Sequence, residues 1–256
     1  MIQPALSKPL SGKTALITGT SKGLGKAMAL ALAGAGARVA LVSRDRAKLD
    51  DVAAAVRALG AEAEVFVCDV TSEAQVRQLE TDFTARCGKL QILVNNAGIN
   101  IRKPLTDFTL DEWRQVLDTN LTSVFLVSRA FVPLMKGQGY GRILNMTSML
   151  SHIALAHRTA YCASKAGLLG LTKALALELI EDKITVNGIS PGPFATEINQ
   201  VILQNPELSR NFLAKIPQGR FGNVEDIGQL ALFLCSEGAG FITGTDIVID
   251  GGWCAQ

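Results

Sequence analysis

Residues 14–25, TALITGTSKGLG, combine a short apolar run, a glycine-rich turn and the start of a segment rich in alanine and leucine. The run predicts a strand at residues 14–17, and the segment predicts a helix at about 23–35. Glycines in such a turn let the backbone approach a pyrophosphate, whose charge then lies at the helix N-terminus. The glycine spacing is three-then-one and differs from G-x-G-x-x-G, so the turn alone is a weak signal.

The rest of the chain repeats this alternation of strand and helix. Ser72, Thr109 and Asn223 mark helix starts, and Gln75 and Glu112 would complete capping boxes with the first two. The further expected strands are residues 37–43, 63–68, 90–94, 142–145, 184–189 and 246–249. The further expected helices are residues 47–59, 73–86, 109–135, 158–181 and 224–234.

The alternation decides the fold class. Continuous apolar strands separated by helices predict an α/β protein with a doubly wound parallel sheet of the Rossmann type, in three layers (α/β/α). No repeat or linker divides the chain, so we expect a tail at residues 1–12 and a single domain at 13–256. Residues 199–213, NQVILQNPELSRNFL, predict a helical lid at about 195–215. Ligands of such folds bind at the carboxyl ends of the strands.

A second group of polar residues falls in residues 145–165, NMTSMLSHIALAHRTAYCASK. Tyr161 and Lys165 are four apart in a predicted helix, so their side chains share a face. The pKa of a tyrosine is ordinarily near ~10, and a nearby cation is expected to lower it. Ser148 follows a strand, and a loop can bring its hydroxyl to the phenol. Together they predict a proton-transfer site, although each alone is more often a packing, solvated or capping residue.

Five motifs in this order resemble the short-chain dehydrogenase/reductase family. They are T-G-x-x-x-G-x-G at 18–25, N-N-A-G at 95–98, Ser148, Y-x-x-x-K at 161–165, and Pro191-Gly192. The resemblance covers about residues 13–253. It implies an NAD(P)-dependent oxidoreductase that transfers a hydride between a nicotinamide and a secondary alcohol or ketone.

The resemblance also implies the catalytic roles. Tyr161 would donate the proton to the substrate in the reduction direction, and Ser148 would orient and polarise the substrate oxygen. Lys165 would lower the pKa of Tyr161 and hold the nicotinamide ribose. Asn120, in DTNL at 118–121, matches a fourth residue that positions a water linking Lys165 to solvent, although ordinary helix polarity also explains it. No metal is expected, because hydrogen bonds and a cation meet the developing negative charge.

The cofactor site follows from the same resemblance. Arg44 lies where the adenosine ribose is expected, and its cationic fork and Lys22 favour NADP; Asp45 keeps NAD possible. Arg44 could equally be a solvated charge. Asp69 would lie beside the adenine or serve as a turn residue, and Asn96 could instead tie strands together. The full expected cofactor set is Gly19, Ser21, Lys22, Gly23, Leu24, Gly25, Ser43, Arg44, Asp69, Val70, Asn96, Gly98, Tyr161, Lys165, Pro191, Gly192, Phe194 and Thr196.

The substrate is less determined by the sequence. Arg102 could bind a substrate carboxylate, and residues 99–104 and 147–151 resemble the gluconate 5-dehydrogenases, which interconvert a sugar acid and its keto form. The 3-oxoacyl-[acyl-carrier-protein] reductases share every motif above, and Lys103 beside Arg102 would suit the acidic face of a carrier. Both could also be exposed loop charges.

Other classes of function remain as alternatives. A cofactor-sensing protein with a silent site, or a structural subunit, could use the same fold, but such proteins usually lack the tyrosine or the lysine. For His152 and His157, which flank the site in sequence, packing or solvent contact is expected rather than catalysis. For Cys162, next to Tyr161, packing is expected.

Composition and charge are those of an ordinary globular protein with a large core. Of the 256 residues, 48% are hydrophobic and 19% are charged, and the net charge of +2 gives no reason to expect nucleic acid or an anionic membrane as partner. Five scattered cysteines predict unpaired thiols in a reducing compartment, and no zinc site. The first 13 residues lack an apolar signal region, so a cytoplasmic protein is expected. The resemblance implies a homo-oligomer, a dimer or tetramer, formed through helices that begin near Asp111 and Arg158.

Overall fold

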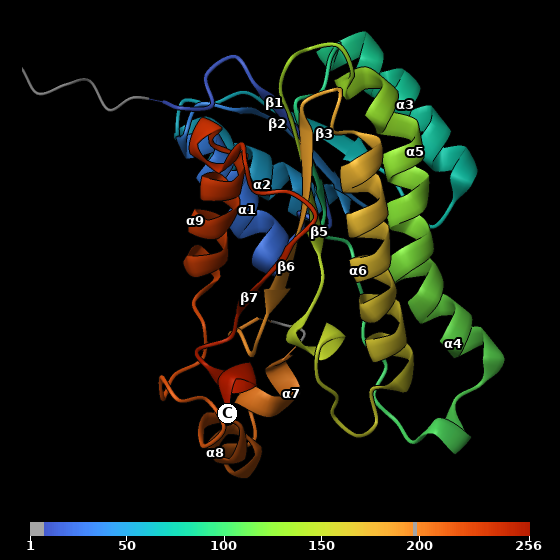
Figure 1. The fold of residues 1–256 in the computed structure, drawn as a ribbon, viewed down its shortest axis with the longest axis vertical. Helices are drawn as coiled ribbons and strands as arrows, with labels where there is room; N and C mark the ends of the chain where they lie inside the picture. The colour runs from blue at the N-terminus through green and yellow to red at the C-terminus, as the bar shows by residue number, and fades with distance from the viewer. Residues whose placement is uncertain (1–7, 197–198) are drawn as a thin grey trace, which may run out of the picture.

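The computed structural model describes residues 8–196 and 199–256, and within them seven strands form one parallel sheet (Figure 1). The strand order is β3-β2-β1-β4-β5-β6-β7, which confirms the predicted doubly wound, Rossmann-type sheet. The order in which strands are added to the sheet reverses between β1 and β4, where such sheets leave a crevice. The strands are β1 (Thr14–Thr18), β2 (Arg38–Ser43), β3 (Ala63–Val67), β4 (Ile92–Asn95), β5 (Gly141–Met146), β6 (Ile184–Pro191) and β7 (Asp246–Ile249).

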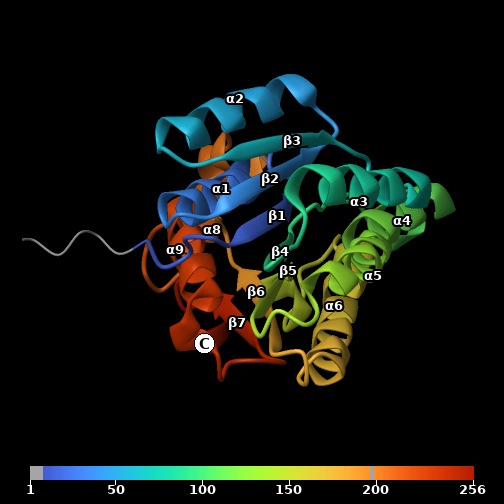
Figure 2. The ribbon, with the colours of Figure 1, turned by 90° about the horizontal axis from the view of Figure 1, so that it is seen from above.

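Helices cover both faces of the sheet, as Figure 2 shows with α1 and α9 on one side and α3, α5 and α6 on the other. The α-helices are α1 (Gly23–Gly34), α2 (Arg46–Ala58), α3 (Glu73–Cys87), α4 (Leu110–Leu117), α5 (Ser123–Met135), α6 (Thr159–Glu178), α7 (Gln200–Leu203), α8 (Pro206–Leu213) and α9 (Val224–Cys235). Shorter helical turns are η1 (Leu105–Asp107), η2 (Asp118–Thr122), η3 (Met149–Ser151), η5 (Glu237–Ala239) and η6 (Trp253–Ala255).

Two hydrophobic cores hold the layers together. On one face, α1, α2 and α9 bury residues such as Met28, Val52 and Ile227 against the sheet. On the other, Phe83 of α3 meets Phe131 of α5 edge-on, with ring centroids 5.3 Å apart. Because both faces are covered, the central strands β1, β4 and β5 are buried along their whole length.

The predicted helix starts are largely confirmed. Thr109 and Glu112 form a reciprocal capping box on α4, and Asn223 forms one on α9. Ser72 caps α3 by accepting a hydrogen bond from the Gln75 N–H, but the box predicted there is wrong. The Gln75 side chain instead accepts a hydrogen bond from the backbone N–H of Asp69.

The helix predicted at residues 109–135 is interrupted. Between α4 and α5, η2 forms a π-helical turn. A π-turn inserts an extra residue into the helix and rotates the side chains that follow it. Here the turn buries Asn120 completely. The periodicity of the sequence did not show this interruption.

The last residues of the predicted tail contact the domain through Leu10. Leu10 is 1% exposed, and its N–H donates to the carbonyl of Ala35, whereas the neighbouring residues 8, 9, 11 and 12 are exposed. Residues 1–7 lie outside the described part of the chain. None of the helices in the described ranges has both the length and the apolar character needed to span a bilayer.

Candidate active site

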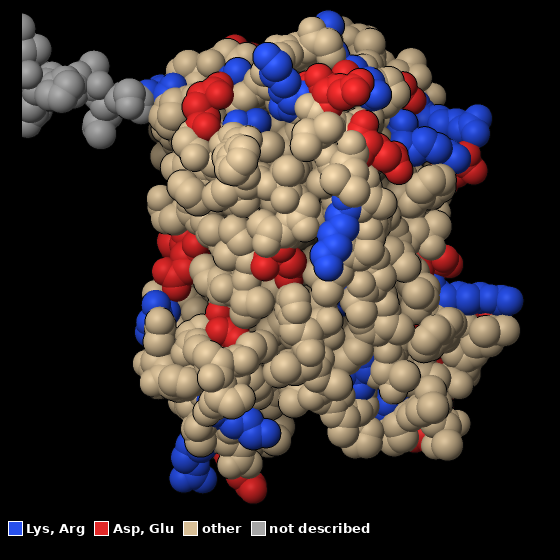
Figure 3. Space-filling view, viewed as in Figure 1, with Lys and Arg blue, Asp and Glu red and all other residues tan. Residues whose placement is uncertain are grey.

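A cleft of about 690 Å³ opens at the carboxyl ends of the strands. Loops after β1, β2, β3, β4, β5 and β6 line it, together with α6 and the segment of α7 and α8. Figure 3 shows the outline of the molecule notched at its lower edge, beside the lobe that α7 and α8 form in Figure 1. All the predicted cofactor residues and Ser148 and Arg102 line this cleft, whereas Asn120 does not.

The glycine loop is shaped to bring the backbone close to a ligand. Gly19 has φ +69°, which L-residues rarely adopt. A Cβ on Gly25 would lie 2.3 Å from the Gly19 carbonyl oxygen, so the loop closes tightly on the first turn of α1. Lys22, the N-cap of α1, makes no side-chain capping hydrogen bond. The N-terminus of α1 is therefore left without a side-chain cap beside the cleft.

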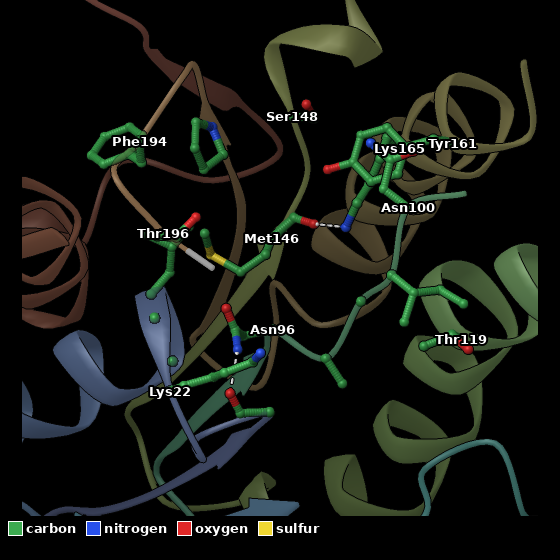
Figure 4. A pocket seen from close by; sticks show the side chains of 18 of the residues that line it. Lys22, Asn96, Asn100, Thr119, Met146, Ser148, Tyr161, Lys165, Phe194 and Thr196 are labelled. Carbon is green, nitrogen blue, oxygen red and sulfur yellow. Dashed lines mark hydrogen bonds between the residues drawn. The ribbon is translucent and has the colours of Figure 1, made fainter. Parts of the chain in front are cut away.

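Asn96 fastens this loop to the end of β4. Its side-chain amide donates to the carbonyls of Thr18 (2.8 Å) and Gly19 (3.1 Å), as the dashed line beside Asn96 in Figure 4 illustrates. The Thr18 hydroxyl accepts hydrogen bonds from the N–H groups of Asn96 and Ala97. The alternative in which Asn96 ties strands together is thus confirmed, and Asn96 also lines the cleft.

Ser148 and Tyr161 come together across the loop between β5 and α6. In Figure 4 they lie on one side of the cleft, with Phe194 and Thr196 across from them. Burial raises the pKa of the Tyr161 phenol, and a hydrogen bond with Ser148 opposes this increase. Ser148 also caps η3, because its hydroxyl accepts a hydrogen bond from the N–H of Leu150 (3.1 Å). Ser148 therefore caps η3 and also forms a hydrogen bond with the phenol of Tyr161.

Burial outweighs the expected effect of Lys165 on Tyr161, because the pKa of Tyr161 is raised rather than lowered. The Lys165 ammonium lies 5.7 Å from the centroid of the Tyr161 ring and donates to the carbonyl of Met146 (2.5 Å; Figure 4). The charges that oppose the raised pKa of Tyr161 are those of Arg102 and Arg158. Burial lowers the pKa of Lys165 itself to about 8, because a desolvated ammonium is disfavoured.

Asn120 supports the site from behind. Its side chain accepts from the N–H of Ile99 (2.8 Å) and donates to the carbonyl of Ile99 (2.9 Å) and to the hydroxyl of Ser164 (3.0 Å). These bonds join the loop after β4 to η2 and α6. A Cβ on Gly98 would lie 3.3 Å from the Asn120 oxygen and 3.6 Å from the Lys165 ammonium, so the three residues are close neighbours.

The outer end of the cleft, after β2 and β3, carries paired charges. Arg44 forms an ion pair with Asp69 (3.7 Å), and Asp69 also accepts hydrogen bonds from Thr71. Asp45 caps α2 and binds the ammonium of Lys48 (2.6 Å). The hydrogen bond from Lys48 lowers the pKa of Asp45. Both groups are therefore in ion pairs, Asp45 at the shorter distance with Lys48 and Arg44 at the longer distance with Asp69.

The turn after β6 completes the opposite wall. Gly192 packs so closely that a Cβ would lie 2.6 Å from the backbone of Asp250. The Phe194 ring covers Gly222 in the same way and is 3% exposed. These contacts fix the turn, which places Thr196 at the cleft.

The inner end of the cleft gathers two guanidinium groups beside Tyr161. Arg102 donates to the side-chain oxygen of Asn199 (3.0 Å), at the start of the predicted lid, and Arg158 donates to the carbonyl of His157. Burial lowers the pKa of both arginines, and the charge of Arg102 lowers that of Arg158 further. The sequence interpretation missed Arg158, although its position three residues before Tyr161 at the N-terminus of α6 could have indicated it.

Other cleft residues were also missed. Leu155 and Phe212 give the inner end an apolar wall, and Phe212 comes from the segment predicted as a lid. Asn100 lines the cleft, and its buried side-chain oxygen has no hydrogen-bond partner among the described residues. By contrast, the Lys103 ammonium forms an ion pair with the Glu112 carboxylate (2.6 Å), and Lys103 does not line the cleft.

Known proteins share this architecture over nearly the whole chain. The family model described as enoyl-(acyl carrier protein) reductase matches residues 19–254. A 3-oxoacyl-[acyl-carrier-protein] reductase of Pseudomonas aeruginosa is 38% identical over 244 residues, 95% of this chain and 98% of the relative.

Two solved structures resemble this chain in both sequence and fold. A short-chain type dehydrogenase/reductase from Mycobacterium marinum has 41% identity and a TM-score of 0.92, covering 98% of each chain. A gluconate 5-dehydrogenase from Burkholderia cenocepacia, in complex with NADP and tartrate, has 36% identity and a TM-score of 0.93, again covering 98% of each chain. The sheet, the motifs and these relatives agree: the chain belongs to the short-chain dehydrogenase/reductase family of oxidoreductases, which act on CH–OH or carbonyl groups.

Proposed function

We propose that this enzyme interconverts a hydroxyl and a keto group of a small organic acid, such as a sugar acid, and that it uses NADP. The observation that carries the proposal is one cleft with a glycine loop at one end and a hydroxyl pair, Ser148 and Tyr161, at the other. The guanidinium groups of Arg102 and Arg158 lie beside Tyr161. The cleft thus has room and chemistry for a dinucleotide and an anionic substrate together.

The residues at the outer end fit a dinucleotide. The first turn of α1 has no side-chain cap, so its N–H groups are available to a pyrophosphate. The buried oxygen of Asn100 suits a ligand hydroxyl, because a buried acceptor without a donor is costly. Arg44 and Lys22 line the outer end, while Asp45 is engaged with Lys48, which favours the 2′-phosphate of NADP over a 2′-hydroxyl.

The chemistry at the inner end requires a proton to accompany the hydride. When bound, the nicotinamide supplies or accepts the hydride at the substrate carbon. In the reduction direction, the Tyr161 hydroxyl donates its proton to the substrate oxygen, and the raised pKa of the phenol keeps that proton in place at neutral pH. Ser148 donates a hydrogen bond to the same oxygen.

The remaining two catalytic-site residues act on the cofactor side. Lys165, held by the Met146 carbonyl, is placed to bind the nicotinamide ribose. Asn120 holds the loop that contains Gly98 through its two bonds to Ile99. Its predicted role in positioning a water is part of this proposal.

The two arginines support an acidic substrate. Their guanidinium groups are partly desolvated and close enough to raise each other's free energy, so a carboxylate beside Tyr161 would stabilise both. A 3-oxoacyl-carrier substrate is the second candidate, supported by the 38% identical relative. Against it, Lys103, which was predicted to suit a carrier, is paired with Glu112.

A substrate screen tests this proposal. NADPH oxidation would be measured with sugar keto acids, their methyl esters and acetoacetyl thioesters, and NADP reduction with hydroxy acids and neutral polyols. We expect turnover of the acids and at least about tenfold lower kcat/KM for each ester, because the ester lacks the anion. Arg102→Gln and Arg158→Gln should remove that preference. Faster turnover of the thioester would favour the carrier substrate, and nucleotide binding with no turnover of any carbonyl would favour a silent site.

A further inference from the structure

Directly behind Ser148, four polar side chains from β6, β7, the β5–η3 loop and the C-terminal end of η3 form a closed network. Asp246 is its centre, and its side chain is 8% exposed. One carboxylate oxygen accepts from the Thr147 hydroxyl (2.5 Å). The other lies 2.5 Å from the Ser190 hydroxyl and 2.5 Å from Nε2 of His152.

The network reaches Ser148 through its backbone. The Ser190 hydroxyl lies 2.9 Å from the Ser148 carbonyl oxygen, as well as 2.9 Å from the Thr147 hydroxyl. Space for Asp246 exists because the adjacent residue on β6 is Gly188, where a Cβ would lie 1.9 Å from the carboxylate. The carboxylate is therefore fitted into the sheet rather than left at its surface.

The Ser190 hydroxyl and His152 share one carboxylate oxygen of Asp246. Ser190 has a single hydroxyl proton but three acceptors within 2.9 Å: Asp246, Thr147 and the carbonyl of Ser148. The Thr147 hydroxyl donates a hydrogen bond to one carboxylate oxygen of Asp246. The other carboxylate oxygen has lone pairs for two donors, and it accepts from the Ser190 hydroxyl and, in the Nε2–H tautomer, from His152. His152 therefore helps to fix the carboxylate that holds the Ser190 hydroxyl, whose oxygen lies 2.9 Å from the Ser148 carbonyl oxygen.

We propose that His152 and Asp246 are positioning residues for Ser148, acting through the hydroxyl of Ser190. The inference rests on the proposed function, in which the Ser148 hydroxyl contacts the substrate oxygen. The Ser148 side chain is anchored to η3 through Leu150, so a shift of its peptide moves the hydroxyl relative to Tyr161. Small displacements of such groups reduce catalysis strongly.

The experiment compares His152→Leu with His152→Gln. Glutamine keeps an N–H donor at a similar reach, whereas leucine keeps the bulk and removes the donor. For His152→Leu we expect kcat to fall about tenfold with an unchanged Kd for NADPH and an unchanged melting temperature. His152→Gln should stay within about threefold of the wild type. Asp246→Asn, which replaces one acceptor by a donor, should resemble the leucine variant.

Hydrogen exchange at residues 147–151 gives a readout that does not depend on turnover. Exchange should be faster in His152→Leu and Asp246→Asn than in the wild type and His152→Gln. Wild-type rates of both kcat and exchange in His152→Leu would overturn the proposal, as would an equal loss of kcat in the leucine and glutamine variants. If the wild type turned over no substrate, the proposed function would fail, while the exchange comparison would still decide whether His152 orders Ser148.

Discussion

At the scale of single residues, Tyr161 and Lys165 show how far spacing alone predicts chemistry. Their separation of four correctly predicts a shared helix face and a common cleft. It does not predict that the Lys165 ammonium binds the Met146 carbonyl, or that burial dominates the pKa of both groups. Desolvation depends on residues brought in by distant strands, so no local pattern in the sequence reports it.

The lowered pKa of Lys165 predicts a pH dependence for the free enzyme. Below about pH 8 the ammonium is charged and available to the nicotinamide ribose, and above it this charge is lost. Tyr161, with its raised pKa, remains protonated over the same range. We therefore expect kcat/KM for ketone reduction to be constant from about pH 6 to 7.5 and to fall above about 8. Steady-state rates in a buffer series of constant ionic strength measure this, and a plateau extending to pH 9.5 would contradict it.

The positive charge of Arg44 predicts a preference for NADP over NAD. Arg44→Asp should reverse the charge that meets a 2′-phosphate and should also lose the ion pair with Asp69. We expect the ratio of kcat/KM for NADP to that for NAD to fall at least about tenfold. The control is Arg46→Asp, an exposed arginine that pairs with Asp50 and does not line the cleft. An unchanged ratio in Arg44→Asp would remove this residue from the account.

At the scale of elements, capping chemistry and hydrophobic runs predict most of the structure. The strands and helices lie close to their expected positions because the apolar runs become strands and the predicted Ser, Thr and Asn caps start helices. The π-turn that buries Asn120 could not be predicted, because its bonds go to Ile99 and Ser164, which are remote in the sequence. The site therefore depends on a departure from regular helix.

The first turn of α1 offers a matched pair of glycines. In Gly25→Ala the new methyl group would meet the Gly19 carbonyl at 2.3 Å, so the loop must open. Gly34, at the other end of the same helix, has open space for a Cβ. We expect Gly25→Ala to weaken nucleotide binding at least about tenfold, and Gly34→Ala to bind normally and be slightly more stable, by about 0.5–1 kcal/mol. Calorimetric titration with NADPH measures both, and normal binding by Gly25→Ala would contradict the proposed phosphate site.

At the scale of the whole molecule, the sheet order follows from the alternation of strands and helices and the right-handed crossovers it requires. Because this topology brings the strand ends together, nearly every motif residue predicted from the sequence lies in one cleft. Arg158 and the network around Asp246 were missed, because they depend on contacts between loops rather than on a motif. The sequence therefore predicts the cleft well and its charged inner end poorly.

The homo-oligomer stays a prediction, and exposed apolar side chains indicate where it can be tested. Figure 3 shows few charged side chains over the centre of the face that carries β7, α5 and α6 in Figure 1. Phe125 of α5 and Leu177 of α6 are large apolar side chains that remain exposed, at 49% and 74%. We expect light scattering to give the mass of a dimer or tetramer, and Phe125→Asp with Leu177→Asp to reduce it. A wild-type monomer at micromolar concentration would contradict this expectation.

The central claim is that the phenol of Tyr161 exchanges the proton that accompanies hydride transfer. Its most direct test is single-turnover stopped-flow of NADPH oxidation by Tyr161→Phe, with the Kd for NADPH measured on the same protein. The account predicts that the rate falls by about 10²- to 10⁴-fold while the Kd stays near that of the wild type. A rate within tenfold of the wild type would contradict it.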